Sequence, residues 1–183
     1  MTEPPEIQTV KIVVTGPFSS GKTSLIQSIS EIDVVSTEGV TAESKTTIAM
    51  DFGRLTVQDD DLYLYLFGTP GARRFDWEIL STPLMIEGFL GIIFVVDSAR
   101  PETFREARAI LNQILIHTDV PFVIAANKQD QPGAWSHRDV GVWLLRGYAE
   151  HVPVLPCVAT DPVAARRVLL ELCYEALRQM DGE

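Results

Sequence analysis

The eight residues GPFSSGKT, at positions 16–23, constrain the fold of this chain more than any other stretch. They match the pattern G-x-x-x-x-G-K-[ST] at every fixed position. A β-branched run, VKIVV at 10–14, precedes them, and an apolar helical stripe follows at residues 25, 26 and 29. Glycines let backbone N–H groups curl around phosphate oxygens, and the N-terminus of the following helix adds its positive end. The motif therefore predicts a strand, a phosphate-binding loop and a helix in succession.

The same loop predicts where a nucleoside triphosphate and Mg²⁺ would bind. The Lys22 ammonium can bridge the terminal phosphates, which makes Lys22 a candidate catalytic residue as well, and the Thr23 hydroxyl can ligate Mg²⁺. The candidate phosphate-binding residues are Gly16, Phe18, Ser19, Ser20, Gly21, Lys22, Thr23 and Ser24.

A second motif, NKQD at 127–130, predicts which base is bound. The Asp130 carboxylate can accept hydrogen bonds from N1–H and the exocyclic amine of guanine, and adenine offers no such pair of donors. A buried carboxylate without partners costs ~1–3 kcal/mol or more, so the site would reject the wrong base. The motif ends an apolar strand, about a hundred residues after the phosphate loop. We therefore predict a guanine site with Asn127, Lys128 and Asp130.

Strand and helix patterns alternate along the chain, with one hairpin early on. Strands are predicted at residues 10–14, 46–57, 62–67, 88–97, 121–127 and 152–159, and helices begin near residues 23, 101, 136 and 161. This order predicts an α/β fold, namely a six-stranded, mostly parallel sheet with one antiparallel edge strand and helices on both faces. Ligands of such sheets bind at the carboxyl ends of the strands. We expect a flexible lead at residues 1–9 and a single domain at 10–181.

The composition of the chain limits the classes of partner and the compartment that we expect for it. Fifteen basic and twenty-five acidic residues leave a net charge of −10, which opposes nucleic acid and anionic lipid surfaces. Cys157 and Cys173 lie among apolar neighbours and are predicted to be buried thiols in a reducing compartment. The longest apolar stretch, 88–96, is half of what spans a bilayer, and neither end carries a signal or lipidation motif. We expect a cytoplasmic protein without a membrane anchor of its own; recruitment to a membrane by a partner stays open.

Over residues 10–180 the chain resembles the Ras-like small GTPases, and these motifs carry the resemblance. It implies a P-loop NTPase G domain that binds GTP and GDP with Mg²⁺. The segment TIAMDF at 47–52 resembles switch I of the Rab branch, where a threonine closes over the γ-phosphate and ligates Mg²⁺. The resemblance makes Thr47 a candidate catalytic and metal-binding residue, and Thr41 and Thr46 are alternatives for the same role. It is also open that Thr47 is only a strand threonine at the rim of the sheet, with no role toward the metal. VATD at 158–161 resembles the loop in which a backbone N–H, here that of Ala159, faces the guanine carbonyl oxygen.

The segment LFGTPGARRF at 66–75 departs from the family pattern Asp-x-x-Gly-Gln. Gly71 is kept, so its N–H can meet the γ-phosphate, and it is a candidate catalytic residue. Gly68 replaces the aspartate that anchors the water shell of Mg²⁺, and Ala72 replaces the glutamine that orients the attacking water. Since phosphoryl transfer depends on positioning and charge stabilisation, these changes predict nucleotide binding with weakened hydrolysis.

The missing aspartate and the run YLFGTPG resemble bacterial GTPases of the MglA type and those encoded beside roadblock-domain proteins. The resemblance implies partners that act through switch I (about 34–47) and switch II (about 69–86), with a roadblock-domain protein as one candidate.

Two further features bear on hydrolysis. Phe18 replaces a small glycine of Ras in the phosphate loop, where its ring would either obstruct an arginine supplied by a partner or simply pack against the switches. Arg73 and Arg74 are candidates for an arginine supplied in cis, and a solvated face of switch II is their alternative reading.

We therefore expect a GTP-binding switch with slow intrinsic hydrolysis. A scaffold that holds GTP without cleaving it is the main rival, favoured by Gly68 and Ala72. A P-loop kinase for a small molecule is the third reading, although such an enzyme has no use for the NKQD motif.

Overall fold

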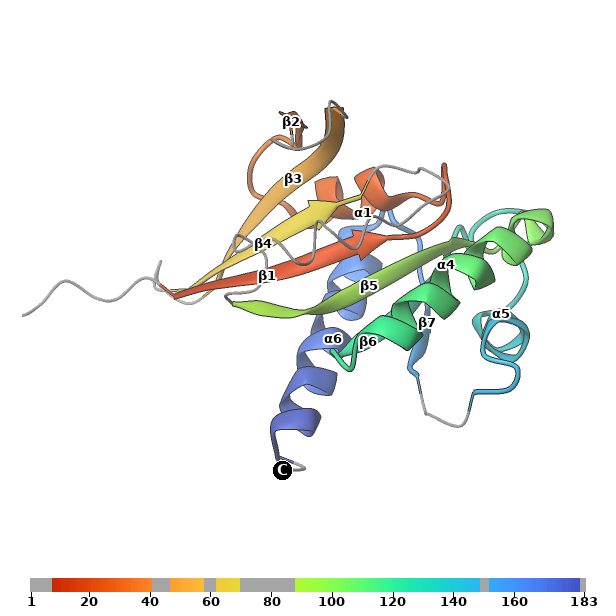
Figure 1. Cartoon of the computed structure of the whole chain (residues 1–183). Coiled ribbons are helices and arrows are strands. Elements are labelled where there is room, and N and C mark those ends of the chain that lie inside the picture. The colour runs from red at the N-terminus through yellow and green to blue at the C-terminus, as the bar shows by residue number, and fades with distance from the viewer. Residues whose placement is uncertain (1–7, 41–46, 58–61, 70–87, 149–151, 182–183) are drawn as a thin grey trace, which may run out of the picture.

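A seven-stranded sheet runs through the molecule, and four helices in the described part of the chain pack on it (Figure 1). The computed structural model describes residues 8–40, 47–57, 62–69, 88–148 and 152–181, without the side chains of 36–40, 47–49 and 117. The strands are β1 (Gln8–Thr15), β2 (Val35–Val40), β3 (Thr47–Val57), β4 (Leu62–Gly68), β5 (Phe89–Asp97), β6 (Phe122–Asn127) and β7 (Val154–Pro156). The helices are α1 (Lys22–Ile29), α4 (Phe104–His117), α5 (His137–Leu144) and α6 (Pro162–Asp181), with a 3₁₀ turn at Pro101–Thr103.

The sheet has the order β2-β3-β4-β1-β5-β6-β7. Strands β4, β1, β5, β6 and β7 are parallel, and β3 runs antiparallel to both of its neighbours. The predicted α/β class and mostly parallel sheet are confirmed. The sheet has one strand more than predicted, because Val35–Val40, expected within switch I, pairs with the open edge of β3. An unpaired strand edge is a ready template for such pairing.

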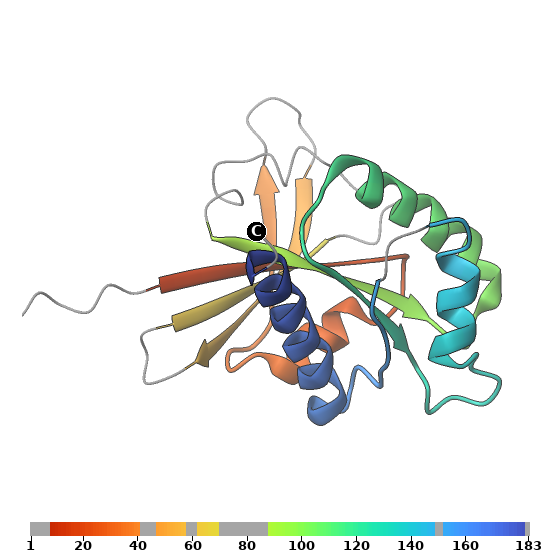
Figure 2. The same ribbon diagram turned by 90° about the horizontal axis from the view of Figure 1, so that it is seen from below.

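Alternate residues of the central strands build two cores, one on each face of the sheet. Ile12, Val14, Ile93 and Val95 face α1 and α6, whereas their neighbours Val13, Ile92, Phe94 and Val96 face α4 and α5. Figure 2 shows the two pairs of helices on opposite faces. Burial on both faces explains why these strands are continuous apolar runs in the sequence.

Local signals in the sequence set the helix ends that lie near the site. Helix α5 begins where the sequence predicted a helix, near residue 136, and Ser136 caps it because its hydroxyl accepts from the Asp139 N–H. Helix α5 ends at Leu144, and Gly147 follows with a φ of 92°. No helix in the described part of the chain is both long and apolar enough to cross a membrane.

The buried Leu111 on α4 offers a test of this packing. Replacing it with alanine should lower the free energy of unfolding by about 2–5 kcal/mol, because the change leaves a cavity beneath α4. Leu170→Ala makes the same chemical change at a position of α6 that is 55% exposed, and should cost less than about 0.5 kcal/mol. Urea denaturation followed by circular dichroism compares the two variants, and equal losses would contradict the described burial.

Candidate functional site

The phosphate loop joins β1 to α1 at the carboxyl edge of the sheet. Its fixed glycines are required by backbone shape and by close contacts. Gly16 has a φ of +141°, and a Cβ there would lie 2.1 Å from the Val95 carbonyl oxygen. Gly21 has a φ of +105°, and a Cβ there would lie 2.1 Å from the Asn127 Nδ2. L-residues with side chains rarely adopt these conformations, so only glycine closes the loop in this way.

Lys22 folds back into this loop. Its ammonium donates to the carbonyl oxygens of Gly16 at 3.0 Å and Pro17 at 2.8 Å. Burial lowers the pKa of Lys22 to about 8, partly opposed by the negative charges of Asp51 and Glu106. Helix α1 begins at Lys22 with no acidic residue in its first turn and no side-chain cap, so its N-terminal N–H groups suit an anion.

The Asn127 side chain ties three segments of the site together. Its Nδ2 donates to the Ser20 carbonyl in the phosphate loop at 2.8 Å. Its Oδ1 accepts from the Ala159 N–H, in the loop after β7, at 2.8 Å. Asn127 is 2% exposed, so both hydrogen bonds are sheltered from water. The motifs predicted for phosphate and for base therefore meet through one amide.

A charged cluster at the end of β5 supports the outer side of the phosphate loop. The buried Asp97 carboxylate accepts from Lys128 Nζ and Arg100 Nε, each at 2.6 Å. Both cations also reach the loop: Lys128 donates to the Ser19 carbonyl, and Arg100 to those of Phe18 and Ser19. Burial alone would raise the pKa of Asp97, but hydrogen bonds from Lys128 and Arg100 outweigh it and lower that pKa.

The sequence motifs do not predict this cluster. They place Lys128 at the base and give no role to Asp97 or Arg100. An aspartate that directly follows a buried apolar strand was the available signal, because such strand ends line the ligand edge.

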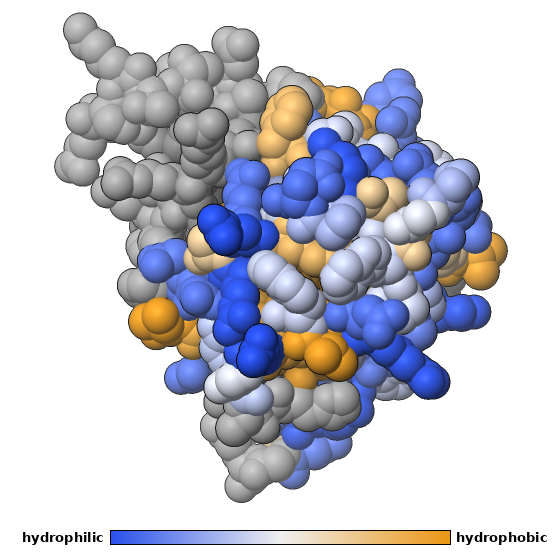
Figure 3. Space-filling view, turned by 90° about the vertical axis from the view of Figure 1, so that its right-hand side faces the viewer, coloured by the Kyte–Doolittle hydropathy of each residue, from blue (hydrophilic) through white to orange (hydrophobic). Residues whose placement is uncertain are grey.

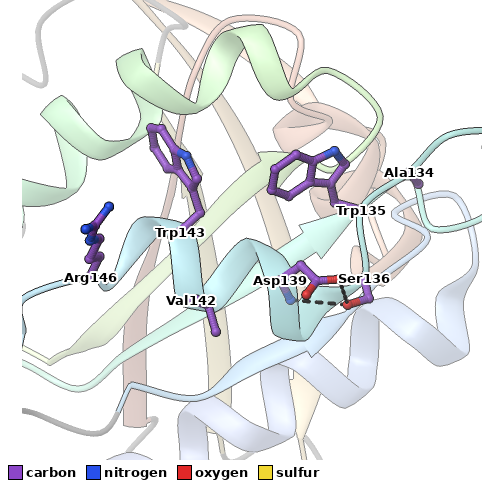
Figure 4. Close-up of a pocket in the computed structure, with 7 residues that line it drawn as sticks. All are labelled: Ala134, Trp135, Ser136, Asp139, Val142, Trp143 and Arg146. Atoms are coloured by element: carbon purple, nitrogen blue, oxygen red, sulfur yellow. Dashed lines mark hydrogen bonds between the residues drawn. The ribbon is translucent and has the colours of Figure 1, made fainter.

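Asp130 follows Lys128 by two residues and is exposed, so its carboxylate is accessible to a ligand. Its neighbour Gln129 donates from Nε2 to the Trp135 carbonyl, which holds the motif against the segment that leads to α5. A shallow hollow beyond that segment is lined by Ala134, Trp135, Ser136, Asp139, Val142, Trp143 and Arg146 (Figure 4). None of the residues predicted to bind nucleotide lines it, so it is separate from the candidate site.

The predicted metal ligand Thr23 is exposed at the start of α1, and its hydroxyl donates to the Asp51 carboxylate of β3. Hydroxyl and carboxylate oxygens are the donors that Mg²⁺ accepts, so this pair fits the cation. Asp51 was not predicted. Within the described residues, no cluster of three or more His, Cys, Asp or Glu could hold a metal on its own.

Thr47 lies apart from this pair. Strand β3 is extended from Thr47, four residues before Asp51, so their Cα atoms lie about 13 Å apart along the strand. Thr47 is thus not brought to Thr23 in this conformation, and its metal role stays a prediction. Thr41, Thr46, Gly71, Ala72, Arg73 and Arg74 lie outside the described residues.

The phosphate loop itself is partly open to solvent. Phe18 is 72% exposed, so its ring does not pack on the described part of the protein. Ser20 is fully buried and Ser24 half-buried. Figure 3 looks onto the carboxyl edge of the strands, where hydrophilic and near-neutral side chains dominate and apolar ones form separate patches. Such a surface suits a polar, charged ligand.

Comparisons with known proteins agree with this geometry. The family model described as "Signal recognition particle receptor beta subunit" matches residues 7–140. ADP-ribosylation factor-like protein 4D of Mus musculus is 35% identical over 143 residues, which are 74% of this chain and 66% of that protein. An uncharacterized protein of Methanocaldococcus jannaschii is 32% identical over 122 residues, 66% of this chain and 71% of that protein. Ras-related protein Rab-18 of Lymnaea stagnalis is 28% identical over 151 residues, 80% of this chain and 70% of that protein.

A parallel sheet with a glycine-rich phosphate loop after its first strand defines the P-loop class of nucleotide-binding domains, here in its G-domain form. The chain belongs to the Ras-like small GTPases, in the family of the signal recognition particle receptor beta subunit. It spans about two thirds of the length of the mouse and archaeal relatives. The relatives named here are archaeal and eukaryotic, and the bacterial branch stays a prediction.

The lowered pKa of Asp97 predicts how the stability of the fold depends on pH. Since its pKa is lowered on folding, its contribution to stability is present above its ordinary value of 3.8 and is lost as the pH falls through the lowered value. Asp97→Asn should reduce the free energy of unfolding at pH 7 by about 1–3 kcal/mol, with a deficit that shrinks toward pH 3. Urea denaturation across this pH range measures it. The exposed Asp119→Asn is the control and should stay within about 0.5 kcal/mol of wild type; a deficit that is constant with pH would contradict the assignment.

Proposed function

We propose that the protein is a Mg²⁺-dependent GTP-binding switch whose intrinsic GTP hydrolysis is slow. The observation that carries this proposal is the Asn127 amide, which joins the phosphate loop to the base-side loop at one edge of the sheet. A nucleotide bound along this edge would contact both motifs at once. The segments that the Asn127 amide already connects would therefore be the ones that contact the bound nucleotide.

The phosphates would be held by the loop residues Gly16, Phe18, Ser19, Ser20, Gly21, Lys22, Thr23 and Ser24. The Lys22 ammonium now donates to two backbone carbonyls, and in the bound state it would donate to phosphate oxygens instead. Since burial has lowered the pKa of Lys22 to about 8, a nearby phosphate would favour its charged form again.

The base would lie between the NKQD motif and the loop after β7. Asp130 would accept from guanine, and Asn127 and Lys128 would shape the wall of the site. The Ala159 N–H is the predicted donor to the guanine carbonyl oxygen; it now donates to Asn127, so that contact would be shared with the amide.

Mg²⁺ would be ligated by the Thr23 hydroxyl and, in the GTP state, by a threonine of switch I. Thr47 is our assignment for that residue, with Thr41 and Thr46 as alternatives. Because Thr47 lies about 13 Å from Asp51 along β3, its arrival at the metal requires the start of β3 to rearrange. A change of this kind between GTP and GDP states would present the switches to regulators and effectors.

Hydrolysis would be slow because Ala72 offers no amide to orient the attacking water. Gly71 would still sense the γ-phosphate through its N–H. A partner would then supply what is missing; a roadblock-domain protein is our candidate, in line with the MglA-like run YLFGTPG. Partners would act through the two switches in the cytoplasm, and one of them could bring the protein to a membrane.

The second candidate is a scaffold that binds GTP and never cleaves it. The residues Gly68 and Ala72 favour it, since they replace the family aspartate and glutamine. A side chain at position 68 would also have to displace its neighbours, because a Cβ there would lie 2.7 Å from Ile26 Cδ1 and 3.0 Å from Asp51 Cβ.

Asp130→Asn tests the base site. Guanine offers an amine at C2, whereas xanthine offers a carbonyl oxygen, and the new amide can donate to that oxygen. GTP affinity should fall at least about tenfold and XTP affinity should rise, because one unpaired hydrogen-bonding group costs about 1–3 kcal/mol. Calorimetric titration with GTP, XTP and ATP measures the change, and Asp119→Asn should behave as wild type. Equal binding of GTP and ATP by the wild-type protein would refute the guanine assignment.

Single-turnover phosphate release from the GTP-loaded protein tests the hydrolysis rate. Without partners we expect a rate at or below about 10⁻⁴ s⁻¹ at 25 °C, similar to or slower than an unassisted small GTPase. Release at about 10⁻² s⁻¹ or faster would mean that a group of this chain replaces the missing glutamine. GTP that stays intact for days would favour the scaffold.

A further inference from the structure

The strand next to Gly68 carries a carboxylate opposite that glycine. Strands β3 and β4 are antiparallel, and their register places Asp51 directly opposite Gly68. A Cβ built on Gly68 would lie 3.0 Å from the Asp51 Cβ and 3.5 Å from its Oδ2. Together with Ile26 Cδ1, which would lie at 2.7 Å, the Asp51 side chain thus occupies the space into which a side chain at position 68 would extend.

Asp51 also contacts the metal side of the phosphate loop. Its Oδ2 accepts the hydrogen bond from the Thr23 hydroxyl. A hydroxyl that donates its proton to a carboxylate keeps its lone pairs for a cation, so the hydrogen bond orients Thr23 as a ligand. Asp51 is half-buried and Thr23 is exposed, which leaves the pair open to an incoming ion and its water.

The charge of this carboxylate suits a metal site as well. Because the Asp51 carboxylate contacts the Thr23 hydroxyl, it can offset part of the charge of a divalent cation bound there.

We propose that Asp51 of β3 replaces the aspartate missing at Gly68 as the carboxylate of the Mg²⁺ site, where it orients the Thr23 hydroxyl and the waters of the ion. This inference rests on the proposed function, because it needs a nucleotide bound together with Mg²⁺. It assigns Asp51 a positioning role toward the metal and none in the chemical step.

Release of methylanthraniloyl-GDP, followed by fluorescence at increasing Mg²⁺ concentrations, tests the inference without any turnover. For the wild-type protein, Mg²⁺ should slow release. For Asp51→Asn and Asp51→Ala, the Mg²⁺ concentration that gives half of this effect should rise about 10–100-fold, as expected when an outer partner of a metal ligand is lost. Release in EDTA should be the same for all proteins, because no metal is then bound.

The exposed Asp119→Ala serves as the control, since it removes one carboxylate elsewhere on the surface. Asp51→Asn keeps the shape of the side chain, so it reports on the charge even where Asp51→Ala folds poorly. Half-effect concentrations within twofold of wild type for Asp51→Asn would overturn the inference. A faster release in EDTA would do so too, because it would mean that Asp51 supports the loop instead of the metal.

The proposed function fails by a different result. If wild-type protein does not bind methylanthraniloyl-GDP, or if Mg²⁺ leaves its release unchanged, the Mg²⁺-dependent switch itself is refuted. If the wild type responds to Mg²⁺ and the Asp51 variants respond equally, only the role of Asp51 is refuted.

Discussion

The buried amide of Asn127 is the interaction on which the candidate site depends. It occupies the carboxyl end of β6 and satisfies a carbonyl from the phosphate loop and an N–H from the loop after β7. Buried groups of this kind need their partners, because an unsatisfied one costs about 1–3 kcal/mol. The amide therefore fixes the spacing between two loops that are more than a hundred residues apart in the sequence.

Close approach to this amide explains why the loop must contain glycine. A Cβ on Gly21 would collide with Asn127 Nδ2, and a Cβ on Gly16 would collide with the end of β5. The cluster of Asp97, Lys128 and Arg100 then supports the loop from its outer side through the carbonyls of Phe18 and Ser19. Hydrogen bonds from three side chains, those of Asn127, Lys128 and Arg100, thus hold the loop in shape before any phosphate binds. A loop that is already ordered lowers the entropic cost of binding.

The sequence predicted those parts of the fold and site whose signals are local. The glycine-rich loop between strand and helix, the apolar central strands and the start of α5 near residue 136 depend on residues close together in the chain, and the structure has each of them. The extra strand Val35–Val40 was missed because its pairing depends on the open edge of β3 and not on its own pattern. Asp51 was missed for a similar reason: its position opposite Gly68 follows from the register of two strands, which no single segment encodes.

The proposed replacement of the aspartate missing at Gly68 by Asp51 bears on how the loss of a motif residue is interpreted. A motif lists the residues of one segment, whereas a metal ion responds to the oxygens around it, whichever strand carries them. Positions directly opposite each other on paired strands have neighbouring Cβ atoms, and a Cβ on Gly68 would lie only 3.0 Å from that of Asp51, so a carboxylate on either strand can serve nearly the same space. The glutamine missing at Ala72 differs, because an alanine offers no amide that could orient a water. Our proposals therefore separate binding from hydrolysis in this chain: Asp51 of β3 would complete the metal site, whereas a partner would have to supply the group that aligns the water.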